Sequence, residues 1–204
     1  MTLNISQKVR AGSNRTWDET VNNIKQTTII ESKMAPHIFN LWVSRNSSIK
    51  SIVYYDIGVD NSGEEIHDKV DENMDFLLYI DTHDGRQFCK EVELQQSVLT
   101  HHAKKEDLYR LKKFTTKIHK IRHLIENHGY LIYHHWAYIL LIKHTGLSHM
   151  LNNYRQKSGR HWNNRQPSIR ITGKELYNDF IQNGLMQYLE FNPDQIEYNK
   201  SIYR

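Results

Sequence analysis

The stretch MDFLLYIDTHDGRQFCKEVEL, residues 74–94, constrains the fold of this chain more than any other part of the sequence. Two runs rich in apolar and aromatic side chains, 75–80 and 87–94, flank the dipeptide Asp84-Gly85. This dipeptide is a strong turn signal between two such runs. The stretch therefore predicts a β-hairpin.

Carboxylates gather at the open end of this hairpin. Residues two apart on a strand project to the same face, so Glu91 and Glu93 point the same way. Counting back from the turn places Asp75, at the start of the other strand, opposite residues 93–95. Carboxylates this close repel one another unless a divalent cation neutralises them, and oxygen ligands suit Mg²⁺ or Mn²⁺. Such a site favours metal-assisted attack of water on a phosphodiester.

This layout resembles the PD-(D/E)XK nuclease superfamily, which has the restriction-endonuclease-like fold. In that family an Asp opens one hairpin strand, an acid-x-Lys triplet lies on the next strand, and a helix often carries a further Glu. The matching positions in this chain are Met74-Asp75, Glu91-Val92-Glu93 and, for the helical acid, Glu31 or Glu19. The resemblance covers about residues 30–140. It implies an α/β fold with a mixed central β-sheet flanked by helices.

Glu93 departs from the family pattern, because the Lys expected there orients the attacking water and offsets negative charge. A minority of restriction enzymes of this fold carry Glu-x-Glu, with the second Glu as candidate general base. Alternatively, the cation comes from Lys90, Lys104 or Lys105. A third possibility is a site that has lost catalysis and only binds.

The resemblance implies that Asp75 and Glu91 hold Mg²⁺ or Mn²⁺, with Glu31 completing the site and Glu93 acting as base or second ligand. The expected activity is a metal-dependent endonuclease on DNA. Alternatives are a non-catalytic nucleic-acid-binding or assembly protein of the same fold, and an RNA endonuclease. A surface hairpin with solvated carboxylates, or a different metal site, also fits the pattern. Cutting both strands of DNA usually needs two sites, which is consistent with a homodimer.

The distribution of charge also favours a polyanionic substrate. The net charge is +4, but residues 60–81 hold eight acidic side chains and a single Lys. Residues 104–122 hold eight Lys or Arg, and residues 143–174 hold seven and no acid. Solvated surfaces explain each basic segment equally well when it is taken alone. The residues expected to bind nucleic acid are Lys105, Lys112, Lys113, Arg155, Lys157, Arg160, Trp162 and Arg165.

Other chemistries are less well supported. His119 and His123 have the spacing of a shared ligand, but no Cys cluster or HExxH motif accompanies them, so zinc is not expected. The single cysteine, Cys89, excludes an internal disulfide and fits a reducing compartment. No run of about 18 apolar residues is present, so we expect a soluble, cytoplasmic protein without a membrane partner.

We expect a single domain over residues 1–204, with the nuclease-like core at about 30–142 and a basic, DNA-binding C-terminal extension at about 143–204. Periodicity and turn signals predict helices at 17–29, 32–45, 104–129 and, more weakly, 146–156 and 174–191. Strands are predicted at 48–57, 75–80, 87–94, 130–136 and 168–173. Residues 137–146 fit either a strand or a helix.

Overall fold

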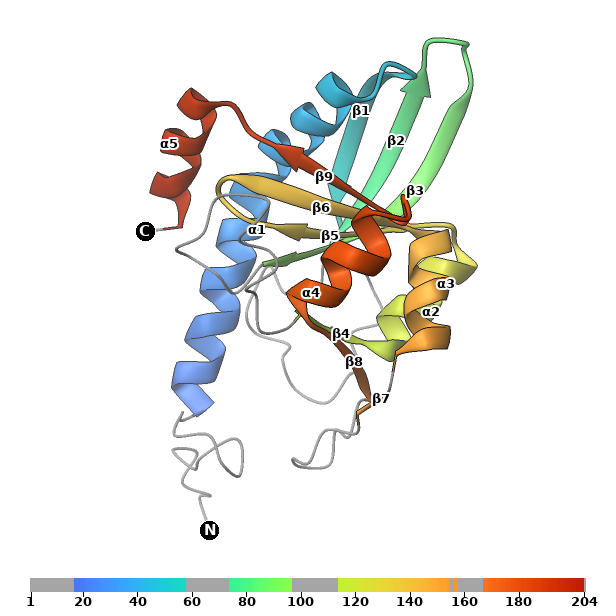
Figure 1. Cartoon of the computed structure of the whole chain (residues 1–204). Coiled ribbons are helices and arrows are strands. Elements are labelled where there is room, and N and C mark those ends of the chain that lie inside the picture. Colours follow the sequence, from blue (N-terminus) through green and yellow to red (C-terminus); the bar gives the residue numbers. More distant parts are fainter. Residues whose placement is uncertain (1–16, 58–73, 97–113, 155, 158–166, 204) are drawn as a thin grey trace.

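The computed structural model describes residues 17–57, 74–96, 114–154, 156–157 and 167–203. A six-stranded sheet in the order β1-β2-β3-β5-β6-β9 forms its centre, beside a three-stranded sheet in the order β4-β8-β7 (Figure 1). In the large sheet only β3 and β5 run parallel, so the sheet is mixed and the α/β prediction is confirmed. The elements are α1 (Trp17–Arg45), β1 (Ile49–Asp56), β2 (Phe76–Thr82), β3 (Gln87–Gln96), β4 (Phe114–Lys117), α2 (Ile118–Glu126), β5 (Tyr130–His134), β6 (Tyr138–Lys143), α3 (His144–Asn153), β7 (Gln156–Lys157), β8 (Ser168–Ile171), α4 (Gly173–Glu175), the π-helix η3 (Leu176–Ile181), β9 (Met186–Glu190) and α5 (Pro193–Ile202).

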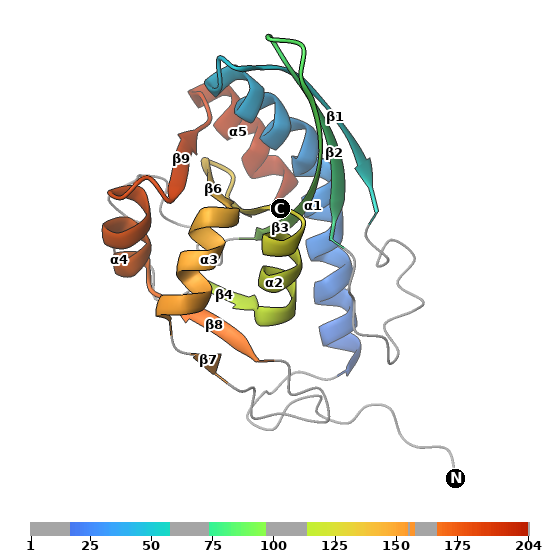
Figure 2. The same ribbon diagram turned by 90° about the vertical axis from the view of Figure 1, so that its right-hand side faces the viewer.

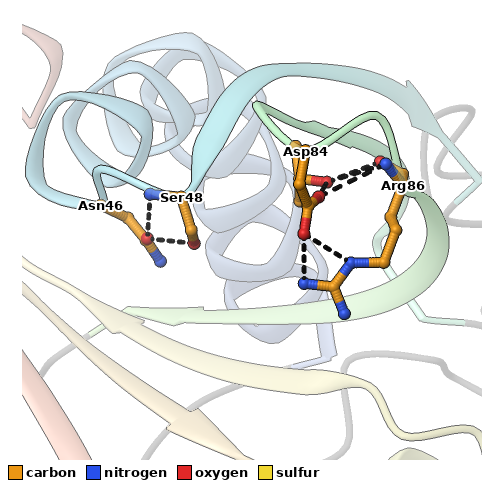
Figure 3. Close-up of polar contacts among 5 residues, drawn as sticks. Asn46, Ser48, Asp84 and Arg86 are labelled. Carbon is orange, nitrogen blue, oxygen red and sulfur yellow. Dashed lines mark hydrogen bonds and ion pairs between the residues drawn. The ribbon is translucent and has the colours of Figure 1, made fainter.

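The predicted hairpin is present. Strands β2 and β3 pair antiparallel, with Phe76 opposite Val92, on either side of the Asp84-Gly85 turn. Gly85 has a φ of 82°, a left-handed conformation that glycine adopts without strain. Figure 3 shows the Arg86 guanidinium folded back onto the Asp84 carboxylate, 2.7 Å away. Hydrogen bonds from Arg86 hold the pKa of Asp84 well below its usual value.

The turn between α1 and β1 is fixed to the tip of the hairpin. Asn46 Oδ1 accepts hydrogen bonds from the backbone N–H and the hydroxyl of Ser48, at 3.1 and 2.7 Å (Figure 3). The carbonyl of Ser48 accepts a hydrogen bond of 3.0 Å from the N–H of His83 in the hairpin turn. The end of α1, the start of β1 and the hairpin therefore form one unit.

Helix α1 is continuous, whereas two helices were predicted for this region. Pro36 lies inside it and cannot donate a backbone hydrogen bond, which normally ends or bends a helix. The residues around Pro36 bury one unbroken stripe against the sheet, formed by Met34, Ala35, Ile38, Phe39, Leu41 and Trp42. Burial of this stripe offsets the missing hydrogen bond.

The prediction of one long helix at 104–129 is wrong for its central part. Residues 114–117 form β4, which pairs with β8, and α2 begins only at Ile118. Phe114 and Thr116 are buried while Lys117 is exposed, a strand alternation that the apolar spacing of three and four had obscured. Residues 114–117 form a strand and not a helix because β8 pairs with them. Residues 104–113 lie outside the described part of the chain.

The end of α2 packs closely on β3. His128 follows the helix with a φ of 51°, and Gly129 comes next. A Cβ at Gly129 would lie 2.6 Å from the carbonyl oxygen of Glu91 and 2.7 Å from Leu124. Only glycine allows the chain to approach β3 this closely before it enters β5.

The C-terminal third contributes to the main body. Residues 138–143, which fitted two predictions, continue the sheet as β6. The predicted helix at 174–191 divides into α4 and η3, followed by β9, which pairs with β6. Residues 143–204, expected as an extension, thus supply a strand of the central sheet, and α5 lies against α1.

The large sheet separates two apolar cores. Figure 2 shows α2 and α3 in front of the sheet and α1 behind it. On one side α1 covers β1, β2 and β3 with residues such as Phe39 and Trp42. On the other side α2, α3 and η3 pack on β5 and β6 around Leu131, Leu140 and Phe180. Alternate residues of β3 therefore face different surroundings, and this alternation positions the acidic side chains discussed below.

A relay of hydrogen bonds with a fixed direction holds α5 in place. The Trp136 carbonyl can only accept, so the buried Asn199 amide donates to it at 3.0 Å. The side-chain oxygen of Asn199 then accepts from Gln195 Nε2 at 2.9 Å. The other hydrogen of Gln195 Nε2 meets His37 Nδ1 at 3.0 Å, so this nitrogen accepts and carries no proton. Burial lowers the pKa of His37, which favours this neutral ring.

His134 holds the other end of α5 and is fully buried. Its Nδ1 lies 2.6 Å from the hydroxyl of Tyr203. Burial lowers the pKa of His134 to about 3, so the ring is neutral at pH 7. Glu31 of α1 lies 3.8 Å from His134 Nε2, and with a neutral ring this contact is not an ion pair.

Acid should destabilise the protein through His134. The unfolded chain binds a proton at this ring below its ordinary pKa of 6.5, whereas the folded chain does so only near pH 3. The unfolded state therefore binds more protons across this window. As the pH is lowered, this group should decrease the free energy of unfolding by up to about 1.4 kcal/mol per pH unit. The free energy of unfolding can be measured by urea denaturation at several pH values between 6.5 and 5. It should change less steeply with pH in His134→Gln than in wild type.

The matched control is His83→Gln, because His83 is exposed in the hairpin turn. This variant should keep the wild-type dependence of stability on pH. If the free energy of unfolding of His134→Gln and of wild type depended equally on pH, His134 would not be the source of the acid sensitivity.

Candidate functional site

Asp75 joins three strands at the open end of the hairpin. It lies at the bend before β2, and continuing the register by one residue places it opposite Glu93. Its carbonyl accepts a hydrogen bond of 3.0 Å from Ile57 N–H, while its Oδ2 accepts one of 2.7 Å from Leu94 N–H. The carboxylate thus takes the place of a strand carbonyl just before β2 begins, where β3 continues beyond the paired segment. Asp75 therefore stabilises the sheet, in addition to any chemical role.

Glu93 is buried against α2 and is paired with a lysine. Lys120 Nζ lies 2.6 Å from Glu93 Oε1 and 2.7 Å from Oε2. The side chains of Lys120 and Glu93 are only 9 % and 10 % exposed. A buried charge without its partner costs several kcal/mol, so each group depends on the other. The helix that follows the hairpin thus provides a cation beside the Glu-x-Glu triplet.

Glu91 faces the same side of β3 but meets solvent. Its Oε2 hydrogen bonds with Nε2 of His123, and Asn127 Nδ2 lies 3.5 Å from the same oxygen. The Glu91 side chain is 27 % exposed, about three times as much as that of Glu93. The two acids of the triplet therefore differ in character, one accessible and one enclosed.

A buried network ties the next residue of this face to its neighbours. Gln95 Nε2 donates to the Thr115 carbonyl at 2.6 Å, and Thr116 Oγ1 donates to Gln95 Oε1 at 2.8 Å. The Thr116 hydroxyl has only one hydrogen, so the Tyr133 hydroxyl, 2.5 Å away, donates to it. Burial raises the pKa of Tyr133 well above its ordinary value, and the charge of Glu93 adds to this effect. The network fixes β4 and β5 beside Glu93.

The structure does not bring Glu31 to the other acids. Glu31 lies on α1 near His134, whose position on β5 is aligned with Gln96 on the α1 side of the sheet. Glu91 and Glu93 face α2, on the opposite side (Figure 2). Glu19, the alternative helical acid, lies in the part of α1 whose side chains are not described.

Most of the predicted nucleic-acid-binding residues lie outside the described part of the chain. Lys157 is within it, in β7, opposite Ser168 of β8. The residues outside are Lys105, Lys112, Lys113, Arg155, Arg160, Trp162 and Arg165. Among the lysines considered as substitutes in the triplet, Lys90 lies opposite the buried Leu78, toward α1, and Lys104 and Lys105 are not described.

The prediction from sequence missed Lys120 and His123 as members of the site. With Asn127 they form a stripe on α2 at spacings of three and four, the spacing that places side chains on one face of a helix. Its polar character, beside the apolar stripe of Ile121 and Leu124, was the available signal. The sequence shows the stripe but not that it faces β3.

Among the described residues, no group of three or more His, Cys, Asp or Glu side chains is arranged to hold a metal ion. Mg²⁺ does not need such a cage, since it commonly takes one or two carboxylates and completes its shell with water and substrate phosphates.

Of the helices described here, none combines the length and apolar composition needed to cross a membrane.

Comparisons of the chain with known protein families, curated proteins and solved structures give no significant match.

Removing one member of the buried pair should destabilise the fold. Lys120→Met leaves Glu93 without its cation and should lower the free energy of unfolding by about 3–5 kcal/mol, and Glu93→Leu should have a similar effect on Lys120. The double variant removes both charges and should recover most of this loss. Urea denaturation of the four proteins measures the coupling.

Glu126→Ala is the control, since Glu126 is exposed on the same helix, and its effect should stay within about 0.5 kcal/mol. Losses that simply add in the double variant would show that Glu93 and Lys120 are not coupled.

Proposed function

We propose that this protein is a metal-dependent endonuclease that hydrolyses phosphodiester bonds of DNA, with a core of the restriction-endonuclease-like type. The contact between Lys120 and Glu93 carries this proposal, because Glu93 stands where the resemblance expects a lysine and Lys120 lies beside it. The order α1, β1-β2-β3, α2, β5, with the short strand β4 inserted before α2, supports it, since the resemblance implies a helix, a hairpin, a helix and a strand in that order.

Asp75 and Glu91 are the proposed metal ligands. Continuing the β2–β3 register makes them diagonal neighbours, whose Cα atoms are typically about 7–8 Å apart in such a pair. Carboxylate oxygens are the donors that Mg²⁺ and Mn²⁺ prefer, so the donor chemistry fits. When bound, the metal supplies charge for a phosphoryl oxygen and a more acidic water.

Lys120 and Glu93 have complementary roles in this proposal. Lys120 takes the place of the triplet lysine and lowers the negative charge that an approaching phosphodiester meets. Glu93 accepts from Lys120 with both oxygens and so fixes the ammonium group. We therefore assign Glu93 to positioning Lys120, rather than to the role of general base. His123 hydrogen bonds with Glu91 and orients this carboxylate.

Plasmid cleavage tests the proposal. Wild type should nick supercoiled DNA with Mg²⁺ or Mn²⁺ and not with EDTA. Asp75→Asn, Glu91→Gln and Lys120→Met should each lower the nicking rate by about 10²-fold or more. Asp75→Asn separates the two roles of Asp75, because an amide oxygen still accepts from Leu94 N–H but lacks the charge.

Arg122→Ala and Glu126→Ala serve as controls, since both residues are exposed on α2. Both variants should cleave as wild type does. Nicking that persists in Asp75→Asn and Glu91→Gln would exclude this site. An RNA endonuclease shares the same metal chemistry. It would be distinguished by faster cleavage of a single-stranded RNA than of DNA of the same sequence.

A non-catalytic nucleic-acid-binding protein of the same fold is the second candidate. The supporting observation is that Glu91 and Glu93 already have His123 and Lys120 as partners. This candidate predicts no cleavage with any divalent metal. It also predicts DNA binding, measured by fluorescence anisotropy, in which the logarithm of the association constant falls linearly with the logarithm of the salt concentration. Asp75→Asn should bind DNA as tightly as wild type.

A further inference from the structure

Strand β1 forms one edge of the six-stranded sheet, and no described strand pairs with its outer side (Figure 2). Ile57 N–H donates to the Asp75 carbonyl across the β1–β2 pair, which fixes the direction of the backbone groups before it. Strand alternation then turns the N–H and C=O groups of Val53 and Tyr55 toward β2. The residues whose backbone groups point outward are Ile52, Tyr54 and Asp56. An edge of this kind is a template for another strand.

Apolar side chains are exposed next to this edge. Val53 and Tyr55 on β1 are 50 % and 56 % exposed, and Tyr79 on β2 is 48 % exposed. The three lie on one face of the sheet, and the rings of Tyr55 and Tyr79 are 5.8 Å apart. We call these three residues the edge patch. Exposed apolar groups beside an open strand edge mark an interaction surface.

The charges of this face favour a protein partner. Apart from the edge patch, the residues of β1 and β2 that project to this side are Ser51, Leu77 and the acid Asp81, with no Lys or Arg among them. A nucleic acid at this edge, away from the Glu91–Glu93 site, would meet no cation on these two strands to neutralise its phosphates. A strand with apolar side chains meets both the unpaired backbone and the edge patch.

We propose that the partner is a second copy of this chain, with the two β1 strands antiparallel about a two-fold axis at Val53. In this register Lys50 of each copy lies opposite Asp56 of the other, and both side chains are exposed. Ile52 then pairs with Tyr54, and Val53 meets its own copy. Shifting the axis to Tyr54 would place Asp56 opposite Ile52 and leave Lys50 without an acid. Charge complementarity therefore selects both the copy and the register.

The β-bulge between Ile49 and Ser51 ends the regular ladder with β2 at Ser51, and Lys50 is the residue within the bulge. The two Lys50–Asp56 pairs thus lie at the two ends of the paired segment, and Val53 lies at its centre. Such pairing joins two six-stranded sheets into one and covers the edge patch of both copies.

The geometry has a consequence that rests on the proposed function. An axis perpendicular to the sheet keeps the same face upward in both copies, so both Glu91–Glu93 sites lie on one side. The two β3 strands are five strand spacings apart, about 24 Å in a flat sheet. The dimer itself does not depend on catalysis, and its test uses no activity.

Sedimentation equilibrium over a range of protein concentrations tests the dimer first. Wild type should show a reversible monomer–dimer equilibrium. Lys50→Glu and Asp56→Lys should each raise the dimer dissociation constant by about tenfold, since each turns two attractive pairs into repulsive ones. The combined variant Lys50→Glu/Asp56→Lys should return to within about threefold of wild type. A monomer at all concentrations, or a double variant without recovery, overturns the proposal.

Disulfide trapping tests the register independently, in a Cys89→Ser background because Cys89 is the single cysteine and is exposed. Val53→Cys should form a covalent dimer on mild oxidation, since its own copy lies opposite at a Cα separation of about 4.5 Å, within disulfide range. Tyr55→Cys is the matched control, on the same face and similarly exposed. Its own copy is about four residues away, near 13 Å, so it should not crosslink. Crosslinking of Tyr55→Cys in place of Val53→Cys overturns the register.

Discussion

The buried pair of Glu93 and Lys120 connects the two parts of the molecule that the chain must bring together. Strand β3 is the last strand of the antiparallel group β1-β2-β3 and also the first of the parallel pair with β5. A charge buried at this junction is stable only beside a cation, so α2 must pack with its polar stripe toward β3. The apolar residues Ile121 and Leu124 then fill the adjoining core.

The sheet divides two environments that serve different purposes. The α1 side is apolar and closed by α5, and its buried polar groups, such as His134 and Asn199, are neutral hydrogen-bonding groups that hold α5 in place. The α2 side carries the charged groups along β3, from the accessible Glu91 to the enclosed Glu93. The sheet thus separates Glu91 and Glu93 from α1, whereas Glu31 lies on α1 itself, in the first environment.

The hairpin could be predicted because its signals are local. A strong turn dipeptide and two β-rich runs act within about twenty residues, and the opposition of Asp75 and Glu93 follows from counting. Other elements were decided by distant partners. Residues 114–117 have an apolar spacing that fits a helix, but β8 provides a ladder for them. Residues 186–190 form a strand because β6 offers an edge, and α1 continues through Pro36 because its buried stripe packs on the sheet.

By itself, the sequence determined the α/β class, the hairpin and the strand positions of Asp75, Glu91 and Glu93 near its open end, because strand periodicity and turn chemistry act between near neighbours. Only the tertiary structure decided which cation meets Glu93 and which acid is excluded. Lys120 and Glu93 are far apart along the chain, and their contact depends on how α2 packs over β3. The distance between Glu31 and the other acids depends on which side of the sheet α1 covers, which local periodicity does not specify.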